Sequence, residues 1–142
     1  MKKVFVLFVL VLFSLSIVGS ATAATKCPQP RKTASAPGGD AGKDMTDKAN
    51  KSKGEKLYQK TAKPMACAMC HGAKGDGNGK LGAGLKPKPR NFTCAETMKD
   101  ISAGQMFWII KNGSKGTPMI KQNLKDGEIW DVVKYIREDL MK

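Results

Sequence analysis

The stretch that decides the fold reads Cys67-Ala68-Met69-Cys70-His71, a C-x-x-C-H motif. At this spacing, two thiols can each add to one vinyl group of a porphyrin, and the next side chain can give the central iron a nitrogen ligand. His71 is the only histidine in the chain, so at most one such group is bound in this way. The motif predicts one covalently attached haem c, held through Cys67 and Cys70, with His71 as an iron ligand.

A C-x-x-C pair also occurs in thiol–disulfide redox proteins and in zinc sites. The redox pair usually lies at the start of a helix after a strand, and no βαβ pattern surrounds this one. A zinc site needs four ligands, and the chain has no second C-x-x-C or H-x-H pair to complete them. A chance occurrence is the remaining alternative. The histidine directly after the second cysteine favours haem over all three.

A second iron ligand has to come from another residue type, because no other histidine exists. Met119 is the best candidate, since it follows a proline in a glycine-bearing loop, where a side chain can point at a cofactor. Met106 and Met98 are the alternatives, although Met106 lies on an expected helix face and is more typical of a hydrophobic core. Met65 and Met69 are too close to the motif to reach the opposite face of the porphyrin.

Helical patterns occur in three segments, and no segment has a convincing strand pattern. Apolar side chains recur at helical spacing in residues 51–62, 102–112 and 126–141. Ser102 and Gln105 predict a capping box at the start of the second helix. Between the motif and that helix, the many glycines predict a tight loop against a flat cofactor, because glycine allows a close backbone approach. The expected fold class is all-α.

The N-terminal 23 residues are typical of a secretory signal peptide. Lys2 and Lys3 precede an apolar run over residues 4–18, and Ala21-Thr22-Ala23 fits a cleavage site. The run is short for a bilayer-spanning helix, which needs about 20 residues, although an uncleaved anchor is the alternative. We therefore expect a periplasmic protein whose mature chain has no integral membrane span.

Residues 24–50 form an expected leader, and residues 51–142 the haem-binding domain. The leader is rich in proline, glycine and small polar residues and has no aromatic residue, so its composition predicts a flexible segment. Cys27 and Cys94 remain after haem attachment, and export would permit a disulfide between them. The sequence leaves open whether they form a bridge or stay two separate thiols.

The chain is strongly basic, with a formal net charge of +13. Removal of the signal peptide leaves 23 basic and 12 acidic residues, a net charge of +11. This balance predicts an acidic partner, and nucleic acid is a poor candidate for an exported chain with no recognition motif. The lysines in segments expected to surround the haem are Lys63, Lys74, Lys80, Lys86, Lys88, Lys111, Lys115 and Lys121.

These motifs together resemble the class I cytochromes c, particularly the short bacterial monohaem type. The resemblance covers about residues 51 to 142 and includes the C-x-x-C-H motif, residues 116–119 (Gly-Thr-Pro-Met), Gly54 with Tyr58, and the apolar stripe of the last helix. It implies that the first and last helices cross near Gly54, that Tyr58 packs near Tyr135, and that His71 and Met119 are the axial ligands. The leader and the Cys27/Cys94 pair lie outside the shared pattern.

The function expected from this reading is electron transport by a monomer whose redox partners are acidic proteins. With both axial positions filled by protein, a substrate cannot easily reach the iron, so no enzymatic activity is expected. The alternative is a haem protein that binds or senses a small ligand when Met119 leaves the iron. A haem peroxidase is disfavoured because no distal histidine and no second haem motif exist.

Overall fold

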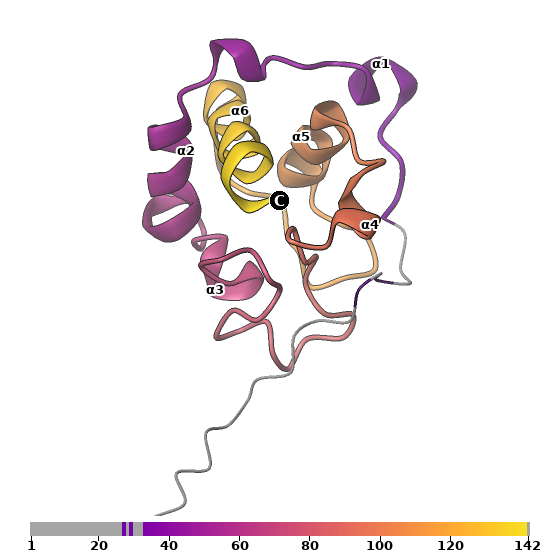
Figure 1. Cartoon of the computed structure of the whole chain (residues 1–142), viewed down its shortest axis with the longest axis vertical. Coiled ribbons are helices and arrows are strands. Elements are labelled where there is room, and N and C mark those ends of the chain that lie inside the picture. Colours follow the sequence, from indigo (N-terminus) through magenta and orange to yellow (C-terminus); the bar gives the residue numbers. More distant parts are fainter. Residues whose placement is uncertain (1–26, 28, 30–32, 142) are drawn as a thin grey trace, which may run out of the picture.

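The computed structural model describes residues 27, 29 and 33–141, and their regular elements are all helical (Figure 1). In chain order the elements are α1 (Gly38–Ala41), η1 (Thr46–Lys48), α2 (Lys51–Lys56), η2 (Leu57–Thr61), α3 (Ala68–His71), α4 (Ala95–Met98), α5 (Ala103–Asn112), α6 (Asp126–Tyr135) and η3 (Ile136–Leu140). This part of the chain contains no strand, which confirms the all-α prediction. None of its helices combines the length and the apolar character that crossing a membrane requires. The predicted signal peptide, residues 1–23, lies outside the described residues.

The first and last long helical segments cross in direct backbone contact. Gly54 of α2 is buried, and a Cβ atom at this position would collide with the backbone carbonyl of Asp131 in α6. Only a residue without a side chain allows so close an approach. One turn further along, the rings of Tyr58 and Tyr135 pack with their centroids 5.4 Å apart. Both contacts expected at this crossing are therefore confirmed.

The core is built around α6 and its continuation η3. Apolar residues recur every three or four positions there and form one buried stripe. Its members are Ile129, Val132, Val133, Ile136 and Leu140. Trp130 extends this contact to α5, where its ring stacks on Phe107 with centroids 4.5 Å apart and an interplanar angle of 19°. Helix α6 is therefore packed between α2 and α5 (Figure 1).

The observed helix limits follow local signals in the sequence. Asn50 precedes α2, and its side chain accepts a hydrogen bond from the backbone N–H of Lys53 at 2.9 Å. Ser102 precedes α5 and accepts from the N–H of Gln105 at 3.1 Å. The short helices α3 and α4 have four residues each and were not expected, because a single turn is too short to show a hydrophobic period.

The predicted capping box at α5 is only half formed. The side chain of Gln105 does not return to Ser102, as the capping box requires, but contacts the leader. Its Nε2 donates to the carbonyl of Ala34 at 3.0 Å, and its Oε1 accepts from the N–H of Ala36 at 2.7 Å. A glutamine side chain is long enough for either partner, and the position of the leader decides between them.

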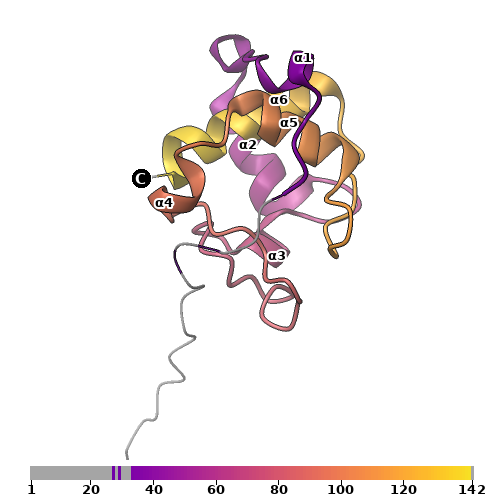
Figure 2. The same cartoon turned by 90° about the vertical axis from the view of Figure 1, so that its right-hand side faces the viewer.

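The first part of the described leader, with α1, lies against α5 in both views (Figures 1 and 2), whereas η1 further along contacts α6. The Ser102 hydroxyl donates to the carbonyl of Ala41 at 2.6 Å, and Gly104 faces the backbone carbonyl of Asp40. Of residues 33–50, only Ala36 is buried. The composition of the leader predicts a flexible segment because it contains few large apolar residues that could be buried. It cannot show the hydrogen bonds that α5 side chains offer to the leader backbone.

Candidate functional site

The C-x-x-C-H motif forms one helical turn in the wall of a largely apolar pocket. Cys67 directly precedes α3, which contains Cys70 and His71, and all three side chains line the pocket. Both cysteines are free thiols. Residues three apart on a helix lie on the same side, so the turn presents both thiols to the pocket. The turn ends at Gly72, whose φ of +80° favours glycine and whose carbonyl accepts a hydrogen bond from the buried Tyr58 hydroxyl at 2.8 Å.

The glycine-rich loop after the motif wraps around the motif helix itself. The N–H of Gly79 donates to the carbonyl of Cys70 at 3.1 Å, and that of Gly77 to the carbonyl of His71 at 2.8 Å. A Cβ atom on Gly79 would collide with the backbone carbonyls of Ala68 and Met69. The sequence predicted a loop pressed against a flat cofactor. The close approach is instead to the backbone of the helix that presents the thiols.

His71 is buried and held from two directions. Its Nδ1 lies 3.0 Å from the carbonyl oxygen of Arg90. A carbonyl can only accept, so Nδ1 carries the proton and Nε2 keeps the lone pair that a metal needs. The ring of Phe92 stacks on the imidazole with centroids 4.7 Å apart and an interplanar angle of 14°. Burial lowers the pKa of His71, and the bond to Arg90 only partly opposes this, so the neutral, metal-binding form is favoured.

The two thiols differ in their surroundings. Burial raises the pKa of Cys67 to about 11, whereas Cys70 is less enclosed and its pKa is raised by the same cause. Both shifts favour the protonated thiol at neutral pH. These cysteines therefore lack the lowered pKa of a reactive redox C-x-x-C pair, which weighs against the thiol–disulfide alternative.

Met119 lies in a loop whose backbone is fixed by short-range hydrogen bonds. Its carbonyl accepts from the N–H of Ser114 at 2.9 Å, and its own N–H donates to the hydroxyl of Thr117 at 3.1 Å. The same hydroxyl donates to the carbonyl of Ser114 at 2.7 Å. Met119 is partly buried and lines the pocket that the motif also lines. The structure thus brings Met119 together with Cys67, Cys70 and His71 around one cavity.

The two competing methionines line the same pocket from different elements. Met98 of α4 is 2% exposed and Met106 of α5 is 6% exposed, and both belong to the main hydrophobic cluster. Met119 is only packed against that cluster from its loop. Their burial fits a role in packing for Met98 and Met106, as the sequence indicated for Met106.

The pocket suits an iron porphyrin in its chemistry. Two thiols at the required spacing, a neutral imidazole with Nε2 left for a metal, and a thioether all reach it. The rest of its wall is mainly apolar, as a flat hydrophobic macrocycle requires. Its apolar side chains include Leu85, Phe92, Ile101, Ile109, Ile110 and Ile136.

The leader contributes to this pocket, which the sequence did not predict. Cys27 and Cys94 form a disulfide with their Cα atoms 5.7 Å apart, which resolves the open pairing in favour of a bridge. Gln29 and Thr33, which follow Cys27 along the leader, both line the pocket. The even number of cysteines outside the motif was the only sequence feature that pointed to this arrangement.

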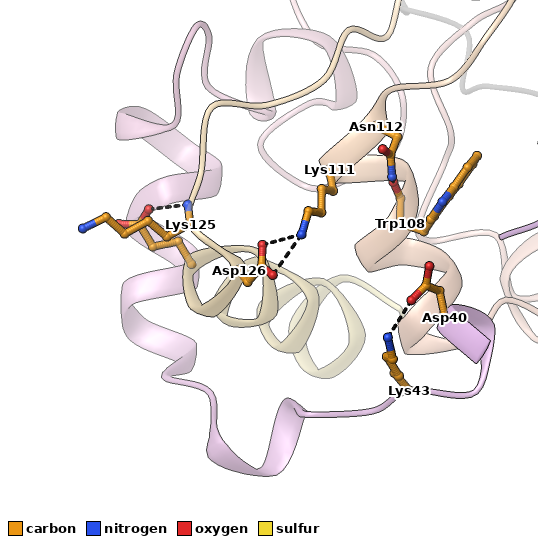
Figure 3. Close-up of polar contacts among 8 residues, drawn as sticks. Asp40, Lys43, Trp108, Lys111, Asn112, Lys125 and Asp126 are labelled. Atoms are coloured by element: carbon orange, nitrogen blue, oxygen red, sulfur yellow. Dashed lines mark hydrogen bonds and ion pairs between the residues drawn. The ribbon is translucent and has the colours of Figure 1, made fainter. Parts of the chain in front are cut away.

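Basic side chains stand at the pocket and elsewhere on the surface. Lys88 and Arg90 line the pocket. Lys111, which the sequence grouped with the lysines around the haem, forms an ion pair with Asp126 at 2.8 Å (Figure 3). It also lies over the ring of Phe107, with Nζ 5.4 Å from the centroid. Lys111 is therefore partly neutralised by α6 and contributes less to a positive surface than its charge suggests.

Comparisons with known proteins agree with this geometry. The family model described as Cytochrome c matches residues 51–138. The chain is similar to one in the solved structure of the reducing HAO-like protein complex of Kuenenia stuttgartiensis, with 27% identity and a TM-score of 0.51. That similarity covers 60% of this chain and 41% of the other, so this chain spans less than half the length of that relative. No curated protein sequence matches the chain.

Proposed function

Because this chain belongs to the cytochrome c family, we propose that it is a monohaem electron carrier that acts in the periplasm. In this proposal, Cys67 and Cys70 attach the haem, and His71 and Met119 are the axial ligands. The bound iron then supplies a one-electron couple between Fe(II) and Fe(III). Two protein ligands leave no open position for a substrate, so we propose no enzymatic role.

One arrangement carries the proposal: the motif and the Met119 loop, which are distant in sequence, line a single apolar pocket. On the motif side, the Arg90 carbonyl and the Phe92 ring restrain the imidazole of His71. A ligand held in this way keeps its orientation when the charge on the metal changes. Small rearrangement between oxidation states is what fast electron transfer needs.

On the other side, the loop bonds around Ser114 and Thr117 restrain Met119. A thioether favours Fe(II) relative to a second imidazole and so raises the midpoint potential. The same restraint opposes departure of Met119 from the iron. It therefore supports electron transfer over the small-ligand alternative.

The export part of the proposal is supported by the Cys27–Cys94 disulfide. Disulfides persist in oxidising compartments such as the bacterial periplasm and are rare in the cytosol. The N-terminal sequence, with its basic start, apolar run and A-x-A site, points the same way.

Haem attachment is tested with Cys67→Ala and Cys70→Ala, alone and together. Each single variant keeps at most one thioether bond, and the double variant keeps none. Denaturing gel electrophoresis with haem staining shows whether the haem stays on the chain. Retention of haem by the double variant would refute the attachment sites.

Axial ligation is tested with Met119→His, with Met106→Leu as the matched control. A second imidazole stabilises Fe(III) more than a thioether does, so Met119→His should lower the midpoint potential, while Met106→Leu changes it little. The weak long-wavelength absorption band of the oxidised protein, expected for Met–iron ligation in this family, should be lost only in the first variant. If the band persists in Met119→His, the second axial ligand is a residue other than Met119. Tight binding of carbon monoxide by the wild-type protein would favour the small-ligand sensing alternative.

The proposed partners are acidic redox proteins that approach the exposed edge of the pocket. Lys88 and Arg90 line that pocket, and few acidic residues interrupt the basic sequence around it. A positive field of this kind raises encounter rates with an acidic surface and acts over about 10 Å at 0.1 M salt. Reversing Lys86 and Lys88 to Glu should slow electron transfer to an acidic partner at low salt and leave the midpoint potential nearly unchanged.

The control for this charge reversal is Lys48→Glu with Lys56→Glu, which changes the net charge equally but outside the segment 85–90, the segment that contributes Leu85 and residues 87–90 to the pocket wall. Stopped-flow rates over a salt series compare the two variants. If both slow the reaction equally, only net charge matters and the pocket edge is not the docking site. A rate that is independent of salt in the wild type would remove electrostatic steering altogether.

A further inference from the structure

A glutamine of the leader holds the backbone segment on which the orientation of His71 depends. We propose that Gln29 is a positioning residue for His71: from a leader anchored by the Cys27–Cys94 disulfide, it fixes residues 89–91 and thereby the Arg90 carbonyl that accepts the His71 Nδ1 proton. This inference rests on the proposed function in one respect, that His71 is the iron ligand.

The side-chain amide of Gln29 contacts both neighbours of Arg90. Its Nε2 donates to the carbonyl of Pro89 at 3.0 Å, and its Oε1 accepts from the N–H of Asn91 at 2.8 Å. The carbonyl of Arg90, between them, lies 3.0 Å from His71 Nδ1. Both polar ends of one planar amide are therefore used to hold the residues on either side of the histidine's acceptor.

Gln29 is itself fixed from two sides. Its backbone N–H donates to the hydroxyl of Thr97 in α4 at 2.9 Å. Two residues earlier, Cys27 is covalently bound to Cys94, which directly precedes α4. Because the backbone at Gln29 is anchored, less conformational freedom remains to be lost when its side chain bonds to residues 89–91, so those bonds restrain their partners more effectively.

The restrained segment has little regular structure of its own. Residues 85–93 lie outside the helices, and Pro89 has no N–H with which to form a backbone bond. After Arg90, the N–H of Phe92 donates to the carbonyl of Gly75 at 2.7 Å. Gln29 thus holds the residues on both sides of Arg90, and Phe92, which stacks on His71, anchors the segment one residue further on.

The chemical consequence concerns the electron density on the imidazole. A hydrogen bond from Nδ1–H to a carbonyl fixes the ring and makes Nε2 a better donor, which stabilises the more oxidised metal. Loosening residues 89–91 weakens this bond. The expected result is an upward shift of the midpoint potential and faster solvent exchange of the His71 Nδ1 proton.

The test uses Gln29→Leu in the full-length holoprotein, with Thr33→Val as the matched control. Both residues lie in the leader and line the pocket, so both substitutions make its wall less polar. Of these two side chains, that of Gln29 hydrogen-bonds to residues 89–91, and the described contacts include no such bond from Thr33. We expect Gln29→Leu to raise the midpoint potential and to speed exchange of the His71 Nδ1 proton, followed by NMR in the Fe(II) state, and Thr33→Val to leave that exchange rate unchanged.

Thr97→Val provides a milder second variant, which matters if Gln29→Leu yields too little holoprotein. Thr97 does not line the pocket, so this change removes an anchor of Gln29 without altering pocket polarity. A smaller upward shift of the potential is expected. In a double-mutant cycle, Gln29→Leu and Thr97→Val should be non-additive, because both act through the same contact.

Unchanged proton exchange in both Gln29→Leu and Thr97→Val, in a protein whose wild type shows His/Met ligation, overturns the positioning role alone. An equal change in Thr33→Val does the same, since it assigns the effect to pocket polarity. Absence of His/Met ligation from the wild-type spectrum refutes the proposed function first and this inference with it.

Discussion

Two glycines lie where another segment packs its backbone directly onto a helix, and the two contacts are held in different ways. Gly54 in α2 faces the carbonyl of Asp131 in α6, and Gly104 in α5 faces the carbonyl of Asp40 in the leader. At both positions a Cβ atom would collide with the opposing carbonyl. The local geometry is the same, so the difference lies in what surrounds each contact.

The α2–α6 crossing is surrounded by buried apolar side chains. Tyr58, Ile129, Val132 and Val133 are all fully buried there. Burial of one large apolar side chain stabilises the fold by about 1.5–3 kcal/mol. The crossing therefore cannot open without exposing the core, and its loss amounts to global unfolding.

The contact between leader and α5 is made mostly by hydrogen bonds. Gln105 and Ser102 bind the leader backbone, and among residues 33–50 only Ala36 is buried. Each such bond contributes about 1 kcal/mol net, because water competes for the same groups. This contact can open locally while the rest of the molecule stays folded. Similar backbone contacts thus differ in stability according to the apolar surface around them.

The largest effect is expected from Gly54→Ala. Alanine favours a helix by about 1 kcal/mol over glycine, yet here its Cβ collides with α6, and overpacking of this kind costs about 1–3 kcal/mol or more. We expect a large loss in the free energy of unfolding, measured with denaturant on the holoprotein. Gly127→Ala in α6 is the control, since its Cβ meets nothing within 4 Å and should be neutral or stabilising. If both variants change the free energy of unfolding in the same direction and by the same amount, then α2 and α6 can move apart to accept the added methyl group.

A smaller loss of stability is expected when the disulfide is removed by Cys27→Ser with Cys94→Ser. The bond joins residues 67 apart in sequence, for which the chain-entropy model gives roughly 4 kcal/mol. Haem attachment already constrains part of that loop, so the measured loss should be less. Thermal unfolding of the holoprotein checks this. Two thiols that can be alkylated in the native wild-type protein would instead show that the bridge does not form in solution.

Gly104→Ala should release the leader with little effect on global stability. Its Cβ collides with the carbonyl of Asp40, but the leader can move away because it buries so little. Limited proteolysis should then cut residues 33–50 faster, while the midpoint of global unfolding changes little. A loss of global stability as large as that of Gly54→Ala would remove the distinction between the two contacts.

The smallest effect on stability is expected at an exposed hydrogen bond at the start of α6. Glu128 in α6 accepts a hydrogen bond from the N–H of Lys125 at 3.0 Å, and this bond lowers the pKa of the carboxyl group. The unfolded chain therefore binds more protons than the folded one in acid, so the stabilisation is present above the ordinary pKa and is lost as pH falls through the lowered one. Glu128→Gln should flatten this acid dependence slightly and change stability little at neutral pH. A large loss of stability at neutral pH would mean that a contact in α6 contributes strongly to the free energy of unfolding even when it is exposed.

Local patterns accounted for much of the fold and of the candidate site. The C-x-x-C-H spacing acts within one helical turn, the apolar stripe of residues 126–140 depends only on the helical period, and Asn50 and Ser102 stand directly before the helices they cap. Such features depend on covalent spacing, so they can be read without knowing the rest of the chain. They were sufficient to predict the three main helical segments and, in the motif, three of the residues that line the pocket.

Only the tertiary structure decided which distant groups meet. A backbone carbonyl exists at every residue, so no sequence pattern selects that of Arg90 as the partner of His71, or Gln29 as the residue that holds it. The side chain of Gln105 could equally have capped α5, and the docked leader decided its partner. Cys27 and Cys94 could be counted but not paired, because pairing depends on the distance between their Cα atoms in the folded chain.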